Sequence, residues 1–512
     1  MFFLKDIVAA IRAYDYRDKL ITAIAFSGFL LMVVKMIVFP YGLFGFGETN
    51  IYTEGLVSAA GIQNINPLFV DYNEADRDIS RLVFSGLMKY APEKEAVVDD
   101  MASLTINEEK TEYTFVLRDG LKWHDGEDVT ADDVMFTFQD IVMHQSFPNE
   151  ILKANFGGVE LEKVDEKTVL FRLEKPNVFF IANLTIGLLP QHVLEGVDPF
   201  DILLHEFNKK PIGTGPYMVT DPVEGFPDGR TQITLERNPY YYSDPSEIEL
   251  MRFIAYPTID QLIEEINAVN GVARISGDHI LDFENNDRFE LVPYELPQYT
   301  GVFMNIDSEV FGEDNAVRIG LQKAIDKDVY IGEDLDKIRV DTPLMELDQG
   351  EWVYQSSIEQ AHGALKEAGY LYDEEDTEKV GVRYNEEGEA LELKLIARLY
   401  DEGTYQYEET IETVSFLIDS WEVVGVSVLV EFLPDHDFKQ SIMRREYDLL
   451  LVGHSLGYNL DTYSYWHSTQ ATPLGQNFSN YKSFATDSLI EDVRSTFDEE
   501  EKTEYLTDLA NK

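Results

Sequence analysis

Apolar and polar residues alternate along Tyr113–Phe138 with two different periods. Every second residue of Tyr113–Leu117 is large and apolar, which predicts a strand with one buried face. Two turn dipeptides follow, Asp119-Gly120 and Asp125-Gly126, and the apolar residues of Val134–Ile141 then recur at helical spacing. Thr130 stands three positions before an aspartate, a pattern typical of a capping box at a helix start. The segment therefore predicts a strand, two turns and a capped helix.

Strand-like and helix-like patterns continue to mix along the rest of the chain. The strand patterns are Thr168–Leu173, Ile233–Arg237, Val302–Ile306, Leu391–Ile396, Val426–Phe432 and Asp448–Val452. The helix patterns are Ile259–Val269, Ala316–Ala324, Ser357–Glu367 and Thr410–Trp421. This mixture predicts an α/β protein with two lobes, each a sheet covered by helices. We place the boundary between the lobes near the turn-rich stretch Pro293–Gly301.

The longest apolar stretch is Leu20–Phe39, which contains one charged residue, Lys35. A helix of this length spans ~30 Å, the thickness of a bilayer core. Four Lys or Arg residues lie in residues 1–19, and the first one after the apolar stretch is Arg77, so the positive-inside rule places residues 1–19 in the cytoplasm. A cleaved signal peptide is the alternative, but no small-x-small cleavage site follows. We expect an uncleaved single-pass anchor in the plasma membrane, a linker over 40–48, and an extracytoplasmic remainder.

Charge and cysteine content exclude several classes of function. The formal net charge is −54, which disfavours nucleic-acid binding because the phosphate backbone would be repelled. A strongly solvated surface is the simplest interpretation of this charge, and a cation-collecting role is the alternative. The chain has no cysteine, so it has neither disulfides nor a lipid-modified cysteine. Its nine histidines form no metal-binding motif, and we expect no metal and no cofactor.

The segment Tyr113–Phe138 resembles the hallmark segment of the extracellular solute-binding proteins of family 5, the dipeptide/oligopeptide type that serves ABC importers. Further segments resemble the same family: Arg81–Met88, Val164–Pro176, Leu189–Leu194, Ile212–Tyr217, Leu235–Tyr242, Phe303–Asp307, Val317–Lys327 and Gln360–Tyr370. The resemblance covers about residues 50–512. Most of the matching residues are turn, cap and core residues, so they identify the scaffold rather than the ligand.

The resemblance implies a two-lobed, periplasmic-binding-protein-like α/β fold (type II) in its three-domain variant. Domain I would comprise residues 49–90 and 190–297, domain II residues 91–189, and domain III, the ligand-facing second lobe, residues 298–512. A non-enzymatic monomer would trap a peptide or similar extended solute by hinge closure and present it to ABC permease subunits. Relatives return to domain I through a last helix and strand, whereas this sequence stops at Lys512, so we expect a truncated or lost closing element.

One motif suggests a different function. Gly453–Gly457 matches G-x-S-x-G, with Ser455 as nucleophile and Asp461 and His467 following in the chain order of a hydrolase triad. Bulky residues directly after the motif argue against a tight elbow, and the two partners follow too closely to come from separate strands. A serine hydrolase therefore remains a minor alternative. A surface receptor or chaperone that works without a transporter is the other.

The loop after Val452 is where we expect ligand specificity. The resemblance implies an aspartate at the position of Gly457, where peptide-binding relatives pair it with the α-ammonium of the peptide. Asp461 either replaces this anchor or caps the next turn. Arg398 pairs either with a ligand carboxylate or, as we favour, with a neighbouring acid. The candidate ligand-binding residues are Asn66, Tyr299, Asn305, Arg398, Tyr458, Asn459 and Asp461.

Overall fold

The computed structural model describes residues 51–70, 73–94, 96–275, 277–311, 315–332, 337–347, 349–373, 381–402, 404–456 and 460–512. The expected membrane anchor, residues 20–39, lies outside this part, together with its flanks 1–19 and 40–48. Within the described part, no helix has the length and apolar character needed to cross a membrane.

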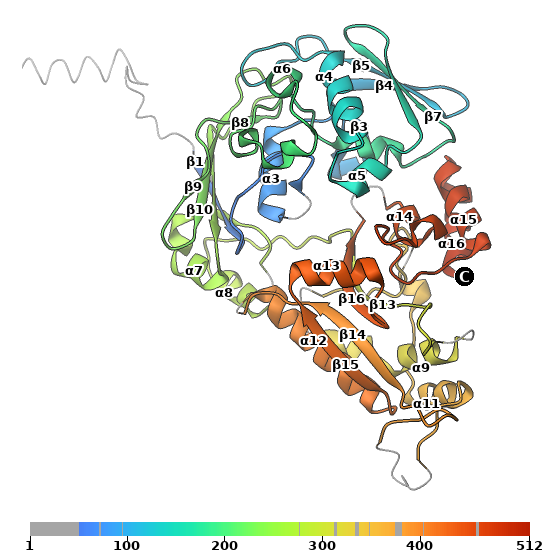
Figure 1. The fold of residues 1–512 in the computed structure, drawn as a ribbon. Helices are drawn as coiled ribbons and strands as arrows, with labels where there is room; N and C mark the ends of the chain where they lie inside the picture. Colours follow the sequence, from blue (N-terminus) through green and yellow to red (C-terminus); the bar gives the residue numbers. More distant parts are fainter. Residues whose placement is uncertain are drawn as a thin grey trace, which may run out of the picture.

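The described chain forms two lobes (Figure 1). We call residues 51–284 the first lobe and residues 298–512 the second lobe. They are joined by residues 285–297, the connector, which contains no helix or strand. The α/β fold predicted from the sequence is confirmed, and each main sheet falls within one of the expected segments.

A six-stranded sheet forms the base of the first lobe. Its strands are β1 (Ile51–Val57), β8 (Tyr217–Val219), β9 (Glu224–Gly225), β10 (Thr231–Arg237), β11 (Leu250–Tyr256) and β12 (Gly271–Val272). β1 lies between β11 and β12 and runs parallel to both, although about 200 residues separate it from them. The helices α3 (Glu74–Val83), α7 (Ile259–Glu264) and α8 (Ile280–Glu284) accompany this sheet.

The other large sheet of the first lobe is antiparallel, and its strands are not in chain order. Its strands, in spatial order, are β4 (Ala102–Ile106), β5 (Glu112–Leu117), β7 (Thr168–Leu173) and β6 (Val159–Lys163). Thr130 and Asp133 form the predicted capping box at the start of α4 (Ala131–Met135), which continues as a π-helical turn over Phe136–Val142. Phe138 packs against Phe171 of β7 with ring centroids 5.6 Å apart, so helix and sheet share one core.

The second lobe is built on a mixed sheet in the order β13 (Gln298–Met304), β16 (Leu449–Ser455), β14 (Glu392–Arg398), β15 (Ser427–Leu433). Leu395 and Leu449 face α9 (Ala316–Ala324), α11 (Ile358–Glu367) and α12 (Tyr405–Glu422). Ile396 and Leu450, one residue further along each strand, face Phe438 of α13 (Asp435–Arg444). The two faces follow from the two-residue period of a strand, and both are covered by helices.

The remaining short elements connect these layers. They are β2 (Met88–Ala91), β3 (Ala96–Asp99), α5 (Glu150–Ala154), α6 (Gln191–Leu194), α10 (Lys327–Ile331) and α14 (Tyr463–Trp466). The chain ends in two longer helices, α15 (Phe484–Ser495) and α16 (Glu499–Ala510). Figure 1 shows these red helices beside the first lobe rather than under the second-lobe sheet.

An apolar cluster joins α15 and α16 to the first lobe. Its buried members are Phe179, Leu344, Leu347, Ile490, Val493, Leu506 and Leu509, which we call the interlobe cluster. Phe179 comes from the first lobe and the others from the second. Lys175 adds an ion pair across the same boundary, with its Nζ 3.0 Å from Glu491 Oε2.

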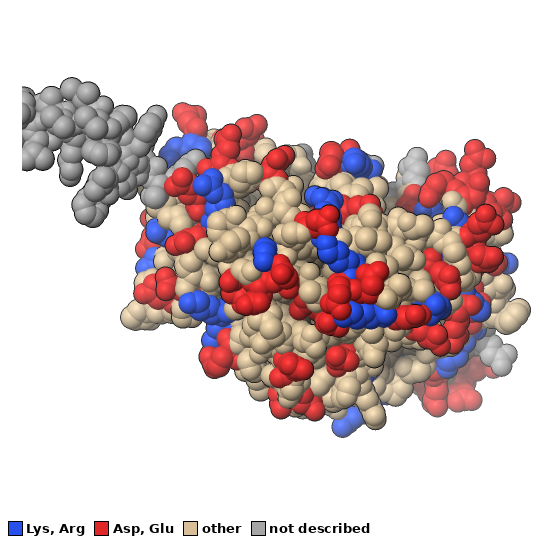
Figure 2. Space-filling model, turned by 90° about the horizontal axis from the view of Figure 1, so that it is seen from above, with Lys and Arg blue, Asp and Glu red and all other residues tan. Residues whose placement is uncertain are grey.

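The surface carries the negative charge that the composition predicts. Figure 2 shows Asp and Glu side chains over the visible face, with fewer Lys and Arg among them. Most of the ion pairs at the surface are partly exposed, so each contributes little by itself.

Candidate functional site

The connector leads directly into the edge strand of the second-lobe sheet. β13 runs antiparallel to β16, and their pairing places Tyr299 opposite His454. One step further, the backbone N–H of Leu456 donates to the carbonyl of Pro297 in the connector, at 2.8 Å. This end of the β13–β16 pair therefore lies where the two lobes meet (Figure 1).

His454 lies within a group of aromatic rings at this end of the sheet. Its ring centroid is 4.3 Å from that of Tyr465, 4.6 Å from Phe303, 5.2 Å from Phe478 and 5.6 Å from Tyr299. We call these four rings the aromatic cage. Tyr299 Oη and His454 Nδ1 are 3.0 Å apart, a hydrogen bond that fixes the imidazole. Burial lowers the pKa of His454 to about 3, so the ring is neutral at physiological pH.

The other ring nitrogen of His454 has no hydrogen-bond partner among the described residues. The imidazole is 4% exposed, so water does not replace that partner freely. Buried polar groups in native proteins are nearly always paired. The unpaired Nε2 of His454 is therefore an exception to this rule, and it lies at the end of the sheet where the lobes meet.

Asp461 follows the loop after β16 and is held by two partners. Its Oδ1 accepts the backbone N–H of Tyr463 at 3.0 Å, and its Oδ2 lies 3.2 Å from Arg494 Nε on α15. Burial raises the pKa of Asp461, and the Arg494 charge acts in the opposite direction. Arg494 also stacks over the Tyr463 ring at 4.2 Å. The carboxylate thus caps the turn before α14, one of the two roles left open by the sequence.

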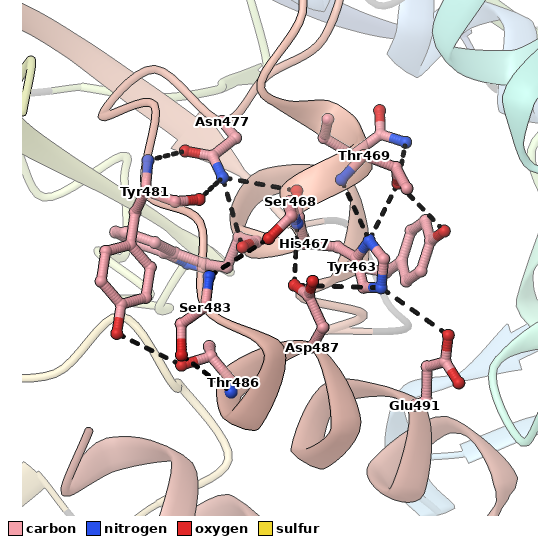
Figure 3. A network of polar contacts seen from close by, with 12 residues as sticks. Tyr463, His467, Ser468, Thr469, Asn477, Tyr481, Ser483, Thr486, Asp487 and Glu491 are labelled. Atoms are coloured by element: carbon pink, nitrogen blue, oxygen red, sulfur yellow. Dashed lines mark hydrogen bonds and ion pairs between the residues drawn. The ribbon is translucent and has the colours of Figure 1, made fainter. Parts of the chain in front are cut away.

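A polar network behind Tyr463 links α14 to α15 (Figure 3). His467 Nδ1 accepts from the backbone N–H of Thr469 at 3.2 Å, and its ring stacks on Tyr463 with centroids 4.2 Å apart. His467 Nε2 points toward two carboxylates of α15, 3.9 Å from Asp487 and 3.7 Å from Glu491. Asp487 in turn accepts the backbone N–H of Ser468 at 2.8 Å. The segment after β16 is thereby attached to the helix that contacts the first lobe.

Two of the predicted site residues lie within the scaffold. Asn66 is fully buried, donates to Asn208 at 3.0 Å and accepts the backbone N–H of Leu68 at 3.0 Å. Asn305 is 5% exposed, donates to the carbonyl of Tyr447 at 3.0 Å and accepts from Asn480 at 2.9 Å. In this conformation both amides hold chain segments together.

The other predicted residues are distributed over the second lobe. Tyr299 is part of the aromatic cage. Arg398, at the end of β14, pairs with Asp435 at 3.3 Å and lies over the Tyr400 ring at 4.9 Å, the neighbouring-acid arrangement that the sequence favoured. Tyr458 and Asn459, with Gly457, lie outside the described residues. The structure therefore brings Tyr299 and Asp461 to the region where the lobes meet, and it pairs Arg398 with an acid of its own lobe.

The structure does not support the hydrolase interpretation of the G-x-S-x-G motif. Ser455 is the last residue of β16 and pairs with Gln298 in the sheet, so it does not stand on a strand-to-helix elbow. Asp461 is bound to Arg494, and His467 Nδ1 is bound to Thr469. Neither reaches Ser455 to form a triad.

Sequence reasoning missed His454 and Arg494. The signal for His454 was available, because Leu450, Val452 and His454 share one face of a strand by their spacing of two. Arg494 carried no local signal, since its partner lies 33 residues earlier in the chain. Among the described residues no group of three or more His, Asp or Glu side chains forms a metal site.

Residues 96–476 match the model of the bacterial extracellular solute-binding proteins, family 5. The chain belongs to this family. The oligopeptide-binding protein AppA of Bacillus subtilis is 24% identical over 471 residues, which cover 86% of this chain and 80% of AppA. The family is thus one of extracellular solute-binding proteins.

Solved structures share the fold at low sequence identity. NikZ from Campylobacter jejuni, in complex with Ni(L-His), matches with a TM-score of 0.72 and 24% identity over 90% of each chain. AppA from Bacillus subtilis, in complex with a nonapeptide, matches with a TM-score of 0.70 and 21% identity over 90% of each chain. At this identity the likeness establishes the periplasmic-binding-protein-like fold and leaves the ligand open.

Proposed function

We propose that this protein captures a peptide or similar extended solute outside the cytoplasm and delivers it to the permease subunits of an ABC importer. The observation that carries this proposal is the position of the β13–β16 end. It lies where the lobes meet, and the connector enters it directly. Rotation about the connector would close the first lobe over Tyr299 and over the loop that follows β16. A ligand would then be enclosed between the two lobes.

The three-domain arrangement is part of the same proposal. The two sheets of the first lobe correspond to domain I (49–90 and 190–297) and domain II (91–189), and the second lobe to domain III (298–512). Residues 20–39 would tether a monomer to the membrane beside its permease. Such a tether keeps the protein at a high effective concentration near its partner.

A peptide is the ligand class that the relatives support best, because AppA is named an oligopeptide-binding protein and was crystallised with a nonapeptide. An extended ligand would bind mainly through its main chain, as in β-strand addition, which tolerates many side chains. Tyr299, Tyr458 and Asn459 remain our proposed contacts in the second lobe. Asn66, Asn305, Arg398 and Asp461 would contribute only after rearrangement, since their polar groups have partners within the chain.

The test is to identify what the protein retains. The full chain is purified in detergent, and mass spectrometry detects the small molecules released on denaturation. We expect short peptides, and we expect small-angle scattering to show a smaller radius of gyration when the stripped protein is given the same peptides. Recovery of only a sugar or a metal chelate, with no peptide binding, would refute the peptide assignment.

A further inference from the structure

Three histidines are buried among the described residues, and they differ in how their ring nitrogens are paired. His467 accepts from Thr469 at Nδ1, and its Nε2 faces the carboxylates of Asp487 and Glu491. His124 is 9% exposed, accepts the backbone N–H of Gly213 at Nδ1 (3.1 Å) and lies 3.2 Å from the carbonyl of Gly215 at Nε2. His454 is 4% exposed and has only the bond to Tyr299. A buried polar atom without a partner destabilises the folded state, so His454 carries a penalty that His124 avoids.

The bond between Tyr299 and His454 determines where the proton of His454 lies. If the hydroxyl of Tyr299 donates to Nδ1, the hydroxyl proton is paired and Nε2 alone is left over; if Nδ1 donates instead, both the hydroxyl proton and Nε2 are left over. Because buried polar groups are nearly always paired, the hydroxyl is the donor. The neutral imidazole then carries its proton on Nε2. The unpaired atom of His454 is therefore an N–H donor.

This donor lies at the end of the sheet that meets the first lobe. His454 stands one residue before the end of β16, opposite the second residue of β13, which directly follows the connector. The carboxylates nearest in the chain already have partners. Asp461 is held by Arg494 and the backbone of Tyr463, and Asp448 accepts from the backbone N–H of Lys394 at 2.7 Å and from Ser308.

We propose that the Nε2–H of His454 donates a hydrogen bond to an oxygen atom of the bound ligand, which in a peptide is a main-chain carbonyl. An ammonium group is itself a donor and cannot accept this bond. The second lobe thus selects a ligand that presents an oxygen acceptor at this point rather than a charged amine. This inference rests on the proposed function and names the chemistry of its specificity.

The experiment compares three variants of the full chain in detergent. The probe is the nonapeptide that the wild-type protein retains best from an equimolar pool of nonapeptides, and calorimetric titration gives its affinity. His454→Phe keeps an aromatic ring in the cage but removes the donor, and we expect the affinity to fall about three- to tenfold. Its thermal midpoint should change little, because the variant removes the unpaired Nε2 but also leaves the Tyr299 hydroxyl without its acceptor.

The second variant, His454→Gln, restores an N–H donor near the position of Nε2 and should recover part of the lost affinity. The third, His124→Phe, is the matched control. It removes a buried histidine with both nitrogens paired, so its thermal midpoint should fall while the affinity stays within twofold of wild type. A loss of affinity in His454→Phe and a loss of thermal stability in His124→Phe would distinguish a donor that binds the ligand from a buried histidine that only stabilises the fold.

Each result supports or overturns the inference. An affinity within twofold of wild type in His454→Phe overturns it, even if peptide binding itself is confirmed. An equal loss in His454→Phe and His454→Gln, with lowered thermal midpoints in both, also overturns it, because the histidine would then serve only packing. A wild-type protein that retains no peptide from the pool refutes the proposed function, and this inference with it.

Discussion

The backbone N–H of Val178, in the first lobe, donates a 2.7 Å hydrogen bond to the carbonyl of Arg494 on α15, in the second lobe. The neighbouring residue Phe179 is 7% exposed and packs in the interlobe cluster. Arg494 holds Asp461 with its side chain while its carbonyl accepts the bond from the first lobe. Arg494 therefore links the contact between the lobes to the turn at Asp461, which follows the proposed ligand loop.

Phe179→Ala should loosen the contact between the lobes. Removing a buried phenylalanine side chain costs about 3 kcal/mol or more, and here the loss falls on the boundary between the lobes. We expect a larger radius of gyration in small-angle scattering of the ligand-free protein.

Phe180→Ala is the matched control for this variant. Phe180 is fully buried but packs within the first lobe, against Phe171 and Tyr113. It should lower the thermal midpoint without increasing the radius of gyration at a temperature where the protein is folded. A radius that rises equally in both variants would contradict an interlobe role for Phe179.

Arg494→Met should destabilise the protein more than Asp461→Asn does. Without the arginine, a buried carboxylate loses its opposite charge, which costs about 3–5 kcal/mol in comparable pairs. An asparagine at position 461 still accepts the backbone N–H of Tyr463, so its loss is smaller. Urea unfolding measures both, and the double variant should recover part of the loss of Arg494→Met. Additive effects in this double-mutant cycle would show that the pair is not coupled.

The buried histidines should make the protein less stable toward acid pH. Burial lowers the pKa of His124 to about 4 and that of His454 to about 3, from 6.5. Between pH 6.5 and 4 the unfolded chain binds protons that the folded chain does not, so the free energy of unfolding falls as pH falls through this window. Asp76 acts in the opposite direction, because burial raises its pKa to about 6.

His124→Phe isolates the histidine contribution to this pH dependence. The slope of unfolding free energy against pH should be shallower in the variant by at most about 1.4 kcal/mol per pH unit. The measurement is urea unfolding at intervals from pH 4 to 8. Between pH 7 and 8 the imidazole is neutral in both states, so the difference between wild type and variant should be constant there. An unchanged slope below pH 6.5 would contradict the lowered pKa.

Salt should raise the thermal stability of the protein. A formal net charge of −54 produces repulsion across a surface where acidic side chains outnumber basic ones (Figure 2). The screening length shortens from about 10 Å at 0.1 M to about 3 Å at 1 M salt, which weakens that repulsion. We expect the thermal midpoint to rise by several degrees in NaCl and less in sucrose of equal osmolality. An equal rise in both solutes would argue against charge repulsion.

The regular elements followed closely from the sequence. The strand Glu112–Leu117, the capping box at Thr130 and the strand Leu449–Ser455 all appear where periodicity and turn residues predicted them. These features depend on neighbours within a few positions, which a single sequence records. The predicted helix Ile259–Val269 is shorter, since α7 ends at Glu264 and a separate short turn covers Ile266–Ala268.

The candidate site was predicted less well, because its contacts are distant in the chain. The bond between Asn66 and Asn208 joins positions 142 residues apart. No local sequence pattern shows that the side-chain amide of Asn66 already has this partner. His454 was hidden inside a motif that pointed to the adjacent serine. Its unpaired nitrogen became visible only when Tyr299 and the surrounding rings were placed around it.

The order in which the chain leaves the ribosome bears on the position of β1. Its neighbours in the six-stranded sheet, β11 and β12, are synthesised about 200 residues later. The sheet of β4, β5, β6 and β7 is contiguous in the chain and can form in the meantime, since even its β5–β7 pairing joins positions no more than 60 residues apart. β1 must therefore remain an unpaired apolar strand while that unit folds. The period before β11 and β12 are synthesised is thus the stage at which a chaperone would protect this protein.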